Sequence, residues 1–550
     1  MNRLFWVICA EIAGLALFLA LAFSGDAGFH EGARVFHIPL DTNPPTLDPV
    51  QITDTISDAV AKKIFNGLVR YDRDLQPVPD LAESWTWSDV DRSYTFKLRR
   101  GVRFHNGREL KAADVKYSWE RLLDPALSRY MQILELVEGA QDKINSTGRV
   151  ADTPGLQALD DYTFKVRLIQ PSPTFLFLVG MLNAAVIPRE AVEEAERAGS
   201  TFGRRPIGTG PFRFVAWHEN TRLVLERNPD YFRGLVKLDG VVFKIVPSPR
   251  MRLEKFFRGE FDVSDIPYLE LPRLESEHPD LLVRKPYLRT SYLAMTMNRP
   301  GPDGKSLPTQ PLGANLKLRQ AINCAINRAH VSGTILAGRS RPAWSILPPG
   351  MPGHDPELRA WHYDLERARR LLAEAGYPQG VGLRALTFLY KADPDVKKIV
   401  LAIHHDLTEL GLNVELQGLD WAAYLDRIDK NPPDLFLLSW VADFNDPDNF
   451  LYFLFHTRQW GDNNHVRYSR REVDQLLDRG RATLDQAERI GLYRQAERLI
   501  LDDCPWAILE NRTNVLLLQP WVKGVRERLT AMDSGPGLNY VDFAEIEVKH

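Results

Sequence analysis

The sequence is poor in cysteine, with only Cys9, Cys324 and Cys504 among its 550 residues. Three cysteines without metal-ligand spacing provide neither a disulfide framework nor a zinc site. Cys9 lies in an apolar N-terminal segment, which leaves two thiols in the body of the chain. We expect Cys324 and Cys504 to be buried separately and unpaired.

An excess of charge of one sign is also lacking. Lys and Arg number 69 against 72 Asp and Glu, which gives a net charge of −3 and a pI near 6.5. Nucleic-acid binding depends on a cationic surface, and neither the balance nor the interspersed order of the charges provides one. We therefore expect no nucleic-acid partner.

The short motifs that mark common enzyme classes are absent. There is no H-E-x-x-H, G-x-S-x-G, Walker A or C-x-x-C sequence. His404, His405 and Asp406 are adjacent, but neighbouring side chains on a helix point in different directions and do not converge on a metal. The sequence predicts no catalytic residues, no metal site and no cofactor.

Long apolar runs are absent apart from one at the N-terminus, residues 4–23, which contains Glu11. Its uninterrupted part is as long as the apolar region of a signal peptide, and Ala20-Leu21-Ala22 resembles a cleavage site. We predict a signal peptide over residues 1–24 and a periplasmic protein. The alternative is an uncleaved membrane anchor, in which Glu11 would be costly.

The body of the chain is long enough for two or three domains, and its apolar patterns alternate between strand and helix. Residues 94–98 alternate as a half-buried strand, and a helix is expected from Ala112. Asp364 and Gly376 have the positions of an N-cap and a C-terminal glycine around another helix. Two further helices are expected over residues 59–65 and from Pro171 to Leu182. The predicted class is α/β.

Three carboxylates, Asp443, Asp446 and Asp448, follow the short apolar strand of residues 434–438. Trp440 and Phe444 lie beside them. Carboxylates and aromatic rings at the end of a buried strand can receive a cationic ligand group. A polar turn that leads into Pro447 explains the same residues.

Several motifs resemble the peptide-type extracellular solute-binding proteins, which are the receptors of ATP-binding cassette (ABC) importers of peptides and nickel. The likeness extends over essentially the whole chain after the leader. It is carried by Ala82-Glu83-Ser84-Trp85, Tyr94-Thr95-Phe96-Lys97-Leu98-Arg99, Val102-Arg103-Phe104-His105-Asn106-Gly107, Ala113-Asp114-Val115-Lys116-Tyr117-Ser118, Gly208-Thr209-Gly210-Pro211-Phe212 and Asn228-Pro229-Asp230-Tyr231-Phe232.

This resemblance implies a type II-like periplasmic binding fold, in which two lobes close around a cleft and are joined by two hinge crossings. The crossings are expected near residues 283–292 and 506–515. Lobe I would comprise residues 33–50, 200–285 and 513–550, with an extra subdomain over 51–199. Lobe II would comprise residues 289–512.

The resemblance also predicts four ligand-binding residues, Asp443, Trp440, Trp421 and Ala442. In peptide-binding relatives the Asp of a W-x-[AG]-D motif accepts the ligand's N-terminal ammonium, and here that motif contains Trp440, Ala442 and Asp443. Trp421 matches an aromatic residue that lines a side-chain pocket, and Trp440 is the second such aromatic. A buried structural role for Asp443 and ordinary core packing for both tryptophans are the alternatives.

The expected ligand is a peptide or peptide-like solute, delivered as a monomeric receptor to an ABC permease in the inner membrane. Leu437 occupies the position where oligopeptide binders carry an Arg for the ligand carboxylate, and Arg339 and Arg341 are conceivable substitutes. A nickel chelate, haem, an opine or an oligosaccharide is an alternative ligand for the same receptor class. An exported hydrolase is the alternative from another class.

Overall fold

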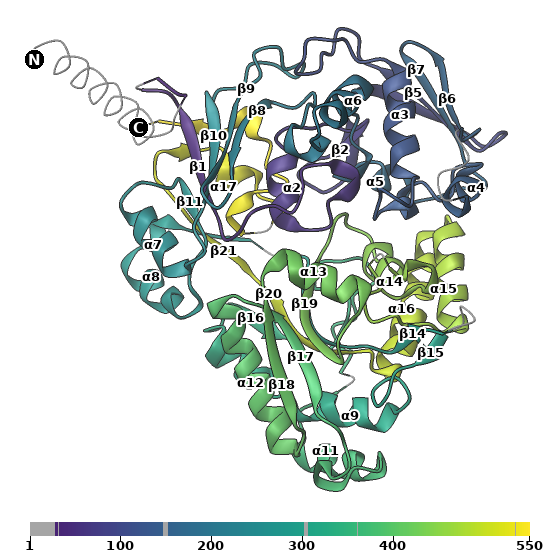
Figure 1. Ribbon diagram of the computed structural model, residues 1–550, viewed down its shortest axis with the longest axis vertical. Helices are drawn as coiled ribbons and strands as arrows, with labels where there is room; N and C mark the ends of the chain where they lie inside the picture. Colours follow the sequence, from purple (N-terminus) through teal and green to yellow (C-terminus); the bar gives the residue numbers. More distant parts are fainter. Residues whose placement is uncertain are drawn as a thin grey trace, which may run out of the picture.

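The computed structural model describes residues 28–30, 32–146, 152–285, 287–301, 306–359, 361–461, 463–533 and 535–549. Two lobes lie one above the other in Figure 1. The predicted signal peptide, residues 1–24, lies outside the described residues. Within the described part of the chain, every helix is too short or too polar to cross a membrane.

Lobe I is built on a four-stranded sheet in the order β1-β10-β9-β8. Its strands are β1 (Val35–Leu40), β10 (Gly240–Ile245), β9 (Arg222–Arg227) and β8 (Phe212–His218). β1 runs parallel to β10, so that Ile38 pairs with Phe243 although the two residues are far apart in sequence. Phe36 and Ile38 enter one hydrophobic cluster, while Val35 packs with Val242 on the other face.

A second four-stranded sheet of lobe I has the order β4-β5-β7-β6. Its strands are β4 (Ala82–Ser88), β5 (Ser93–Leu98), β7 (Thr163–Arg167) and β6 (Leu156–Asp160), and helix α3 (Ala112–Leu122) contacts it. The Trp119 ring of α3 meets the Phe164 ring edge-on at 5.4 Å, and both are fully buried. The predicted strand over residues 94–98 and the helix from Ala112 are confirmed.

Lobe II is built on a six-stranded mixed sheet. The strands, in spatial order, are β16 (Ser340–Pro342), β20 (Trp506–Arg512), β13 (Arg289–Met295), β19 (Leu435–Val441), β17 (Leu386–Lys391) and β18 (Val414–Leu419). Helices α9 (Leu316–Ala325), α11 (Leu365–Glu374) and α12 (Pro394–Leu410) share a hydrophobic cluster with this sheet. Cys324 and Cys504 are buried and unpaired, which confirms that prediction.

The boundaries of α11 follow from its capping residues. The Asp364 carboxylate accepts a hydrogen bond from the Arg367 N–H at 2.8 Å, as an N-cap does. Gly376 has a φ of 92°, the left-handed conformation that favours glycine just beyond a helix. Both ends lie where the sequence predicts them.

The chain passes twice between the lobes, along neighbouring paths. β12 (Leu282–Lys285) leads into β13, and β20 leads into β21 (Asn514–Leu518). β12 pairs antiparallel with β21 in a three-stranded sheet that also contains β11 (Val263–Ser264), and β13 pairs antiparallel with β20. The two crossings therefore lie side by side, which is the geometry required for hinge motion.

The remaining elements surround these sheets. The other helices are α2 (Thr55–Ala61), α4 (Ala140–Asn145), α5 (Phe175–Leu178), α6 (Arg189–Arg197), α7 (Pro249–Phe257), α8 (Leu271–Glu277), α10 (Arg328–His330), α13 (Trp421–Lys430), α14 (Asp448–Phe455), α15 (Arg471–Ala482), α16 (Gln486–Asp503) and α17 (Val525–Arg528). The other strands are β2 (Val69–Tyr71), β3 (Pro77–Pro79), β14 (Asn298–Pro300), β15 (Ser306–Pro308), β22 (Val522–Lys523) and β23 (Glu547–Val548).

Two predicted helices are wrong in extent. The helix predicted over residues 59–65 is α2, which begins at Thr55 because the Asp54 carboxylate caps the N–H groups of Ile56 and Ser57 at 3.0 Å. The helix predicted to reach Leu182 is only α5, four residues long. Beyond it, the Asn183 amide donates hydrogen bonds to two carbonyl groups of the segment before α2, so tertiary pairing replaces helical pairing there.

Candidate functional site

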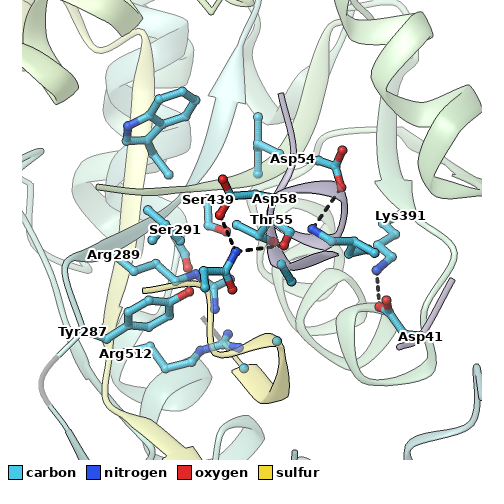
Figure 2. A pocket seen from close by; sticks show the side chains of 18 of the residues that line it. Asp41, Asp54, Thr55, Asp58, Tyr287, Arg289, Ser291, Lys391, Ser439 and Arg512 are labelled. Carbon is cyan, nitrogen blue, oxygen red and sulfur yellow. Dashed lines mark hydrogen bonds and ion pairs between the residues drawn. The ribbon is translucent and has the colours of Figure 1, made fainter. Parts of the chain in front are cut away.

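A cavity of about 450 Å³ lies between the two lobes. Figure 2 shows a pocket with Asp54, Thr55 and Asp58 of the segment around α2 on one side, and with Arg289, Ser291 and Ser439 of the lobe II sheet facing it. Its volume lies in the range that holds small-molecule ligands. This interface between lobes is the principal candidate site.

The lobes are closed over this cavity. Lys391 of lobe II forms an ion pair with Asp41, which follows β1 of lobe I. The Tyr540 hydroxyl of the C-terminal segment donates a hydrogen bond to the Asp443 carbonyl of lobe II at 3.0 Å. Because such contacts cross the cleft, the structure represents the closed form of a two-lobe protein.

Asp443 lines the cavity just beyond the end of β19. The Asn449 side chain clamps it from two sides: its amide donates to Asp443 Oδ2 at 3.0 Å, and its oxygen accepts from the Asp443 N–H at 3.0 Å. Burial raises the pKa of the Asp443 carboxyl to about 6, while Asn449 and the Lys62 ammonium act in the opposite direction. The carboxylate is held rigidly in a poorly hydrated position.

Trp440 and Ala442, the two residues around Val441, also line the cavity. Trp440 is buried and donates from its indole N–H to Asn449 Oδ1 at 2.9 Å. Ala442 is buried and donates from its main-chain N–H to the Leu288 carbonyl at 2.8 Å. Trp440 thus helps to position the Asn449 clamp, a role that the sequence did not indicate.

Trp421 lines the cavity as the first residue of α13. Its ring stacks on Tyr424 with centroids 5.6 Å apart and planes at 10°, and the Lys391 ammonium lies 5.4 Å from its ring centroid. The Trp421 side chain is half-buried, so one part packs in lobe II and another meets the cavity. The helix start is fixed by Asp420, which caps the Ala423 N–H at 3.0 Å.

Asp446 and Asp448 lie in the predicted turn, and both also bind side chains of the surrounding structure. Asp446 accepts the Asp448 N–H at 2.9 Å, as in a polar turn, and forms a two-pronged ion pair with Arg489. Asp448 begins α14 and accepts a hydrogen bond from the Tyr493 hydroxyl at 2.7 Å. Neither carboxylate lines the cavity, which separates them from Asp443.

The structure brings further residues to the cavity that sequence analysis missed. Asp54 immediately precedes α2 and Asp58 lies on it (Figure 2). The Asn539 amide donates to Asp58 Oδ2 at 2.6 Å. Lys62 pairs with Asp58 at 2.9 Å and lies over the Tyr540 ring. The sequence contained one signal for this part of the site: Asp54 precedes a helix, which is the position of an N-cap.

The two arginines considered for a ligand carboxylate differ in position. Arg339 lines the cavity but is buried and donates to the Ile266 carbonyl at 2.5 Å. Arg341 is exposed on β16 and does not line the cavity. His404 Nε2 lies 3.1 Å from the Val414 carbonyl oxygen, and no group of metal-ligating side chains was found among the described residues.

Comparisons with known proteins agree with this geometry. Residues 76–462 match the family model described as bacterial extracellular solute-binding proteins, family 5 Middle. The chain is 30% identical over 505 residues to the glutathione-binding protein GsiB of Escherichia coli, covering 90% of this chain and 91% of that protein. It is 29% identical over 485 residues to the heme-binding protein A of Haemophilus influenzae, covering 86% of each.

A solved structure is similar over nearly the whole chain. It is the periplasmic binding protein DppA from Helicobacter pylori in complex with the peptide STSA, with a TM-score of 0.82 and 27% identity. The match covers 94% of this chain and 98% of that chain. The α/β two-lobe fold is confirmed by this likeness.

Proposed function

The chain belongs to the bacterial extracellular solute-binding proteins of family 5, and from this premise we propose that it is the peptide receptor of an ABC importer. It captures a peptide or peptide-like solute in the cavity between its lobes. It then delivers the solute, as a monomer in the periplasm, to a permease in the inner membrane.

One observation carries this proposal: a clamped carboxylate, Asp443, lines a closed cavity of about 450 Å³ between two lobes. A carboxylate in such a place binds an ammonium group through short, charge-assisted hydrogen bonds. Each is worth roughly 1.5–3 kcal/mol. The N-terminal ammonium of a peptide satisfies this requirement, and Asp443 would thereby set the position of the peptide in the cleft.

The other three residues support the same ligand. Trp421 presents part of an aromatic ring to the cavity and would line a side-chain pocket. Trp440 and Ala442 hold the strand end that carries Asp443. The relatives reported above are named as binding proteins, and the proposed receptor likewise returns its ligand unchanged.

We further assign the moving parts by residue. Residues 33–50, 200–285 and 513–550 form lobe I, residues 51–199 its extra subdomain, and residues 289–512 lobe II. Closure is a rotation of lobe II about the two crossings between them. The ligand stabilises the closed form because it contacts both lobes at once.

Mass spectrometry of the protein purified from periplasm tests the ligand class. We expect a peptide or peptide-like molecule to be released on denaturation. Recovery of haem, a metal chelate, an opine or a sugar would identify that molecule as the ligand and contradict the assignment of a peptide. Conversion of added labelled peptide into fragments would contradict the receptor role and indicate a hydrolase.

Calorimetry on Asp443→Ala tests the ammonium anchor. The substitution should weaken a peptide with a free amine by roughly 1.5–3 kcal/mol, or about ten- to a hundredfold in Kd. An N-acetylated peptide, which lacks the ammonium, should lose far less. Asp426→Ala is the matched control, because Asp426 is an exposed carboxylate on α13 outside the cavity. Equal losses for both peptides would remove the anchoring role.

A further inference from the structure

The C-terminal loop, residues 535–540, forms part of the lobe I wall of the cavity. The Tyr540 hydroxyl donates at 3.0 Å to the Asp443 carbonyl of lobe II, so the loop carries one of the contacts that cross the cleft. The conformation of the loop therefore affects lobe closure as well as the shape of the cavity. Its cavity-lining residues are Gly535, Pro536, Gly537, Asn539 and Tyr540.

The backbone of this loop is strained. Leu538 has a φ of 49°, in the left-handed region that residues with a β-carbon rarely occupy. Gly537 lies so close to α2 that an added β-carbon would be 2.6 Å from the β-carbon of Ala59. A strained backbone of this kind persists only where the surrounding structure holds it. The loop therefore requires support from its neighbours.

The Lys63 side chain provides this support. Lys63 lies just beyond α2, and its Nζ donates to the Gly537 carbonyl at 3.0 Å and to the Leu538 carbonyl at 2.8 Å. The main-chain carbonyl of Lys63 accepts the Phe212 N–H of β8 at 3.0 Å. Lys63 thus joins the strained loop to the end of α2 and to the lobe I sheet.

The amino group of Lys63 is buried at a cost. The residue is 1% exposed, and burial lowers the pKa of its amino group to about 7. Asp533 and Asp58 act in the opposite direction, while the Lys62 ammonium adds to the lowering. A buried polar group is tolerated where it is hydrogen-bonded. The ammonium has three N–H donors and the neutral amine has two, so either form can bind both loop carbonyls.

Other contacts fix the end of the loop that carries Tyr540. The Tyr540 N–H donates to Asp533 Oδ1 at 2.7 Å, and Asp533 Oδ2 accepts the Thr530 N–H at 2.7 Å. The Asn539 amide donates to the Thr55 carbonyl at 3.0 Å. Because the Tyr540 N–H is bonded only when the loop is in place, its hydrogen exchange reports on the position of the loop.

We propose that Lys63 is a positioning residue: it holds the C-terminal loop against α2, so that the Tyr540 hydroxyl reaches the Asp443 carbonyl when the lobes close. This inference rests on the proposed function, in which lobe closure captures the ligand. Lys63 itself does not line the cavity. Its effect on ligand binding is therefore transmitted through the loop.

Hydrogen exchange at the Tyr540 N–H and calorimetry with alanine peptides of different lengths test this role. Lys63→Met removes the donors and keeps an apolar stem, and Lys63→Gln retains an amide donor on a shorter stem. Tyr540→Phe removes the hydroxyl that crosses the cleft. Lys143→Met is the matched control, because Lys143 of α4 is also buried but pairs with Glu120 of α3, outside the cavity.

Exchange at the Tyr540 N–H should be roughly tenfold faster in Lys63→Met, because two hydrogen bonds that hold the loop are lost. It should be less accelerated in Lys63→Gln and unchanged in Lys143→Met. Peptide affinity should fall in Lys63→Met and in Tyr540→Phe. The double variant should bind no more weakly than the weaker single variant, because both substitutions act through one contact. If Lys63→Met does not fold, Lys63→Gln enters the same comparisons.

Three results overturn the inference and leave the proposed function in place. Unchanged exchange at Tyr540 in the Lys63 variants would show that other contacts hold the loop. Equal acceleration in Lys143→Met would assign the effect to general stability. Additive losses of affinity in the double variant would show that Lys63 does not act through Tyr540.

Failure of the native protein to bind any of the peptides would instead remove the proposed function. The exchange rates need no ligand, so they still decide whether Lys63 holds the loop. Faster exchange in Lys63→Met than in Lys143→Met would support the inference in that case, and equal rates would overturn it.

Discussion

Tyr452 donates a hydrogen bond from its hydroxyl group to the Glu135 carboxylate across the boundary between the lobes, at 2.7 Å. Tyr452 lies on α14 of lobe II, and Glu135 lies in the loop before α4 of lobe I. Arg481 of lobe II also forms an ion pair with Glu135. These three side chains are almost fully buried, so lobe closure buries a charged contact away from the cavity.

Tyr452→Phe should weaken lobe closure. The hydroxyl donates to a charged acceptor, and its loss should cost roughly 1–2 kcal/mol, a five- to thirtyfold loss of ligand affinity. Calorimetry gives the affinity, and small-angle X-ray scattering without ligand should show a larger radius of gyration. Tyr424→Phe is the control, because the Tyr424 hydroxyl donates at 2.8 Å to Leu437 within lobe II. Equal effects of both variants would contradict a role in closure.

Glu135→Gln should open the lobes further than Tyr452→Phe. The substitution removes the charge that Arg481 meets across the boundary and leaves Arg481 with Asp448 in its own lobe, at 3.4 Å. Breaking a buried ion pair costs roughly 3–5 kcal/mol, which exceeds the roughly 1–2 kcal/mol expected for the single hydrogen bond of the Tyr452 hydroxyl. Scattering profiles of the two ligand-free variants provide the comparison. A closed profile for Glu135→Gln would mean that the pair does not hold the lobes together.

Binding of peptides with a free amine should weaken as the pH falls through about 6, the pKa of Asp443 raised by burial. The carboxyl becomes protonated below this pH and no longer attracts an ammonium. The ligand-free protein should become more stable as the pH falls from about 6 to about 4. In this range the folded protein binds a proton at Asp443 and the unfolded chain does not, because the pKa of Asp443 is raised in the folded state. Calorimetry from pH 5 to 8 on native protein and Asp443→Asn measures the difference. If the affinity changes equally with pH in both proteins, Asp443 is not the group whose protonation weakens binding.

The two cavity tryptophans should respond differently to replacement by phenylalanine. Trp440→Phe removes the indole N–H that holds Asn449, which should cost about 1 kcal/mol of stability and weaken free-amine peptides. Trp421→Phe removes no hydrogen bond that is needed by Asp443 and should alter the preference for ligand side chains. Thermal unfolding and a peptide panel separate the two effects. Identical profiles would show that Trp440 has no positioning role.

The buried thiols should be unreactive in the folded protein. Burial raises the pKa of both the Cys324 and the Cys504 thiol, so little reactive thiolate is present at neutral pH. A chromogenic disulfide reagent should find two thiols after denaturation if the leader that contains Cys9 is removed, and three if it is retained. Rapid reaction of the folded protein would contradict the burial of these residues.

Local patterns predicted the local elements well. The alternation at Tyr94, Phe96 and Leu98 gives β5, and Asp364 and Gly376 mark the ends of α11. These features depend on neighbouring residues only, so the sequence carries them directly. The same holds for the position of Asp443 just after a buried strand, although its role in ligand binding stays a prediction.

Tertiary structure alone decided which charges meet. Lys391 meets Asp41, and Glu135 meets Tyr452, only because the lobes close. Short sequence windows cannot predict such pairs, since strand order and lobe contact are set by burial over the whole chain. Burial also sets the raised pKa of Asp443. The sequence therefore determined the class of protein and its candidate anchor, and the folded arrangement decided what surrounds that anchor.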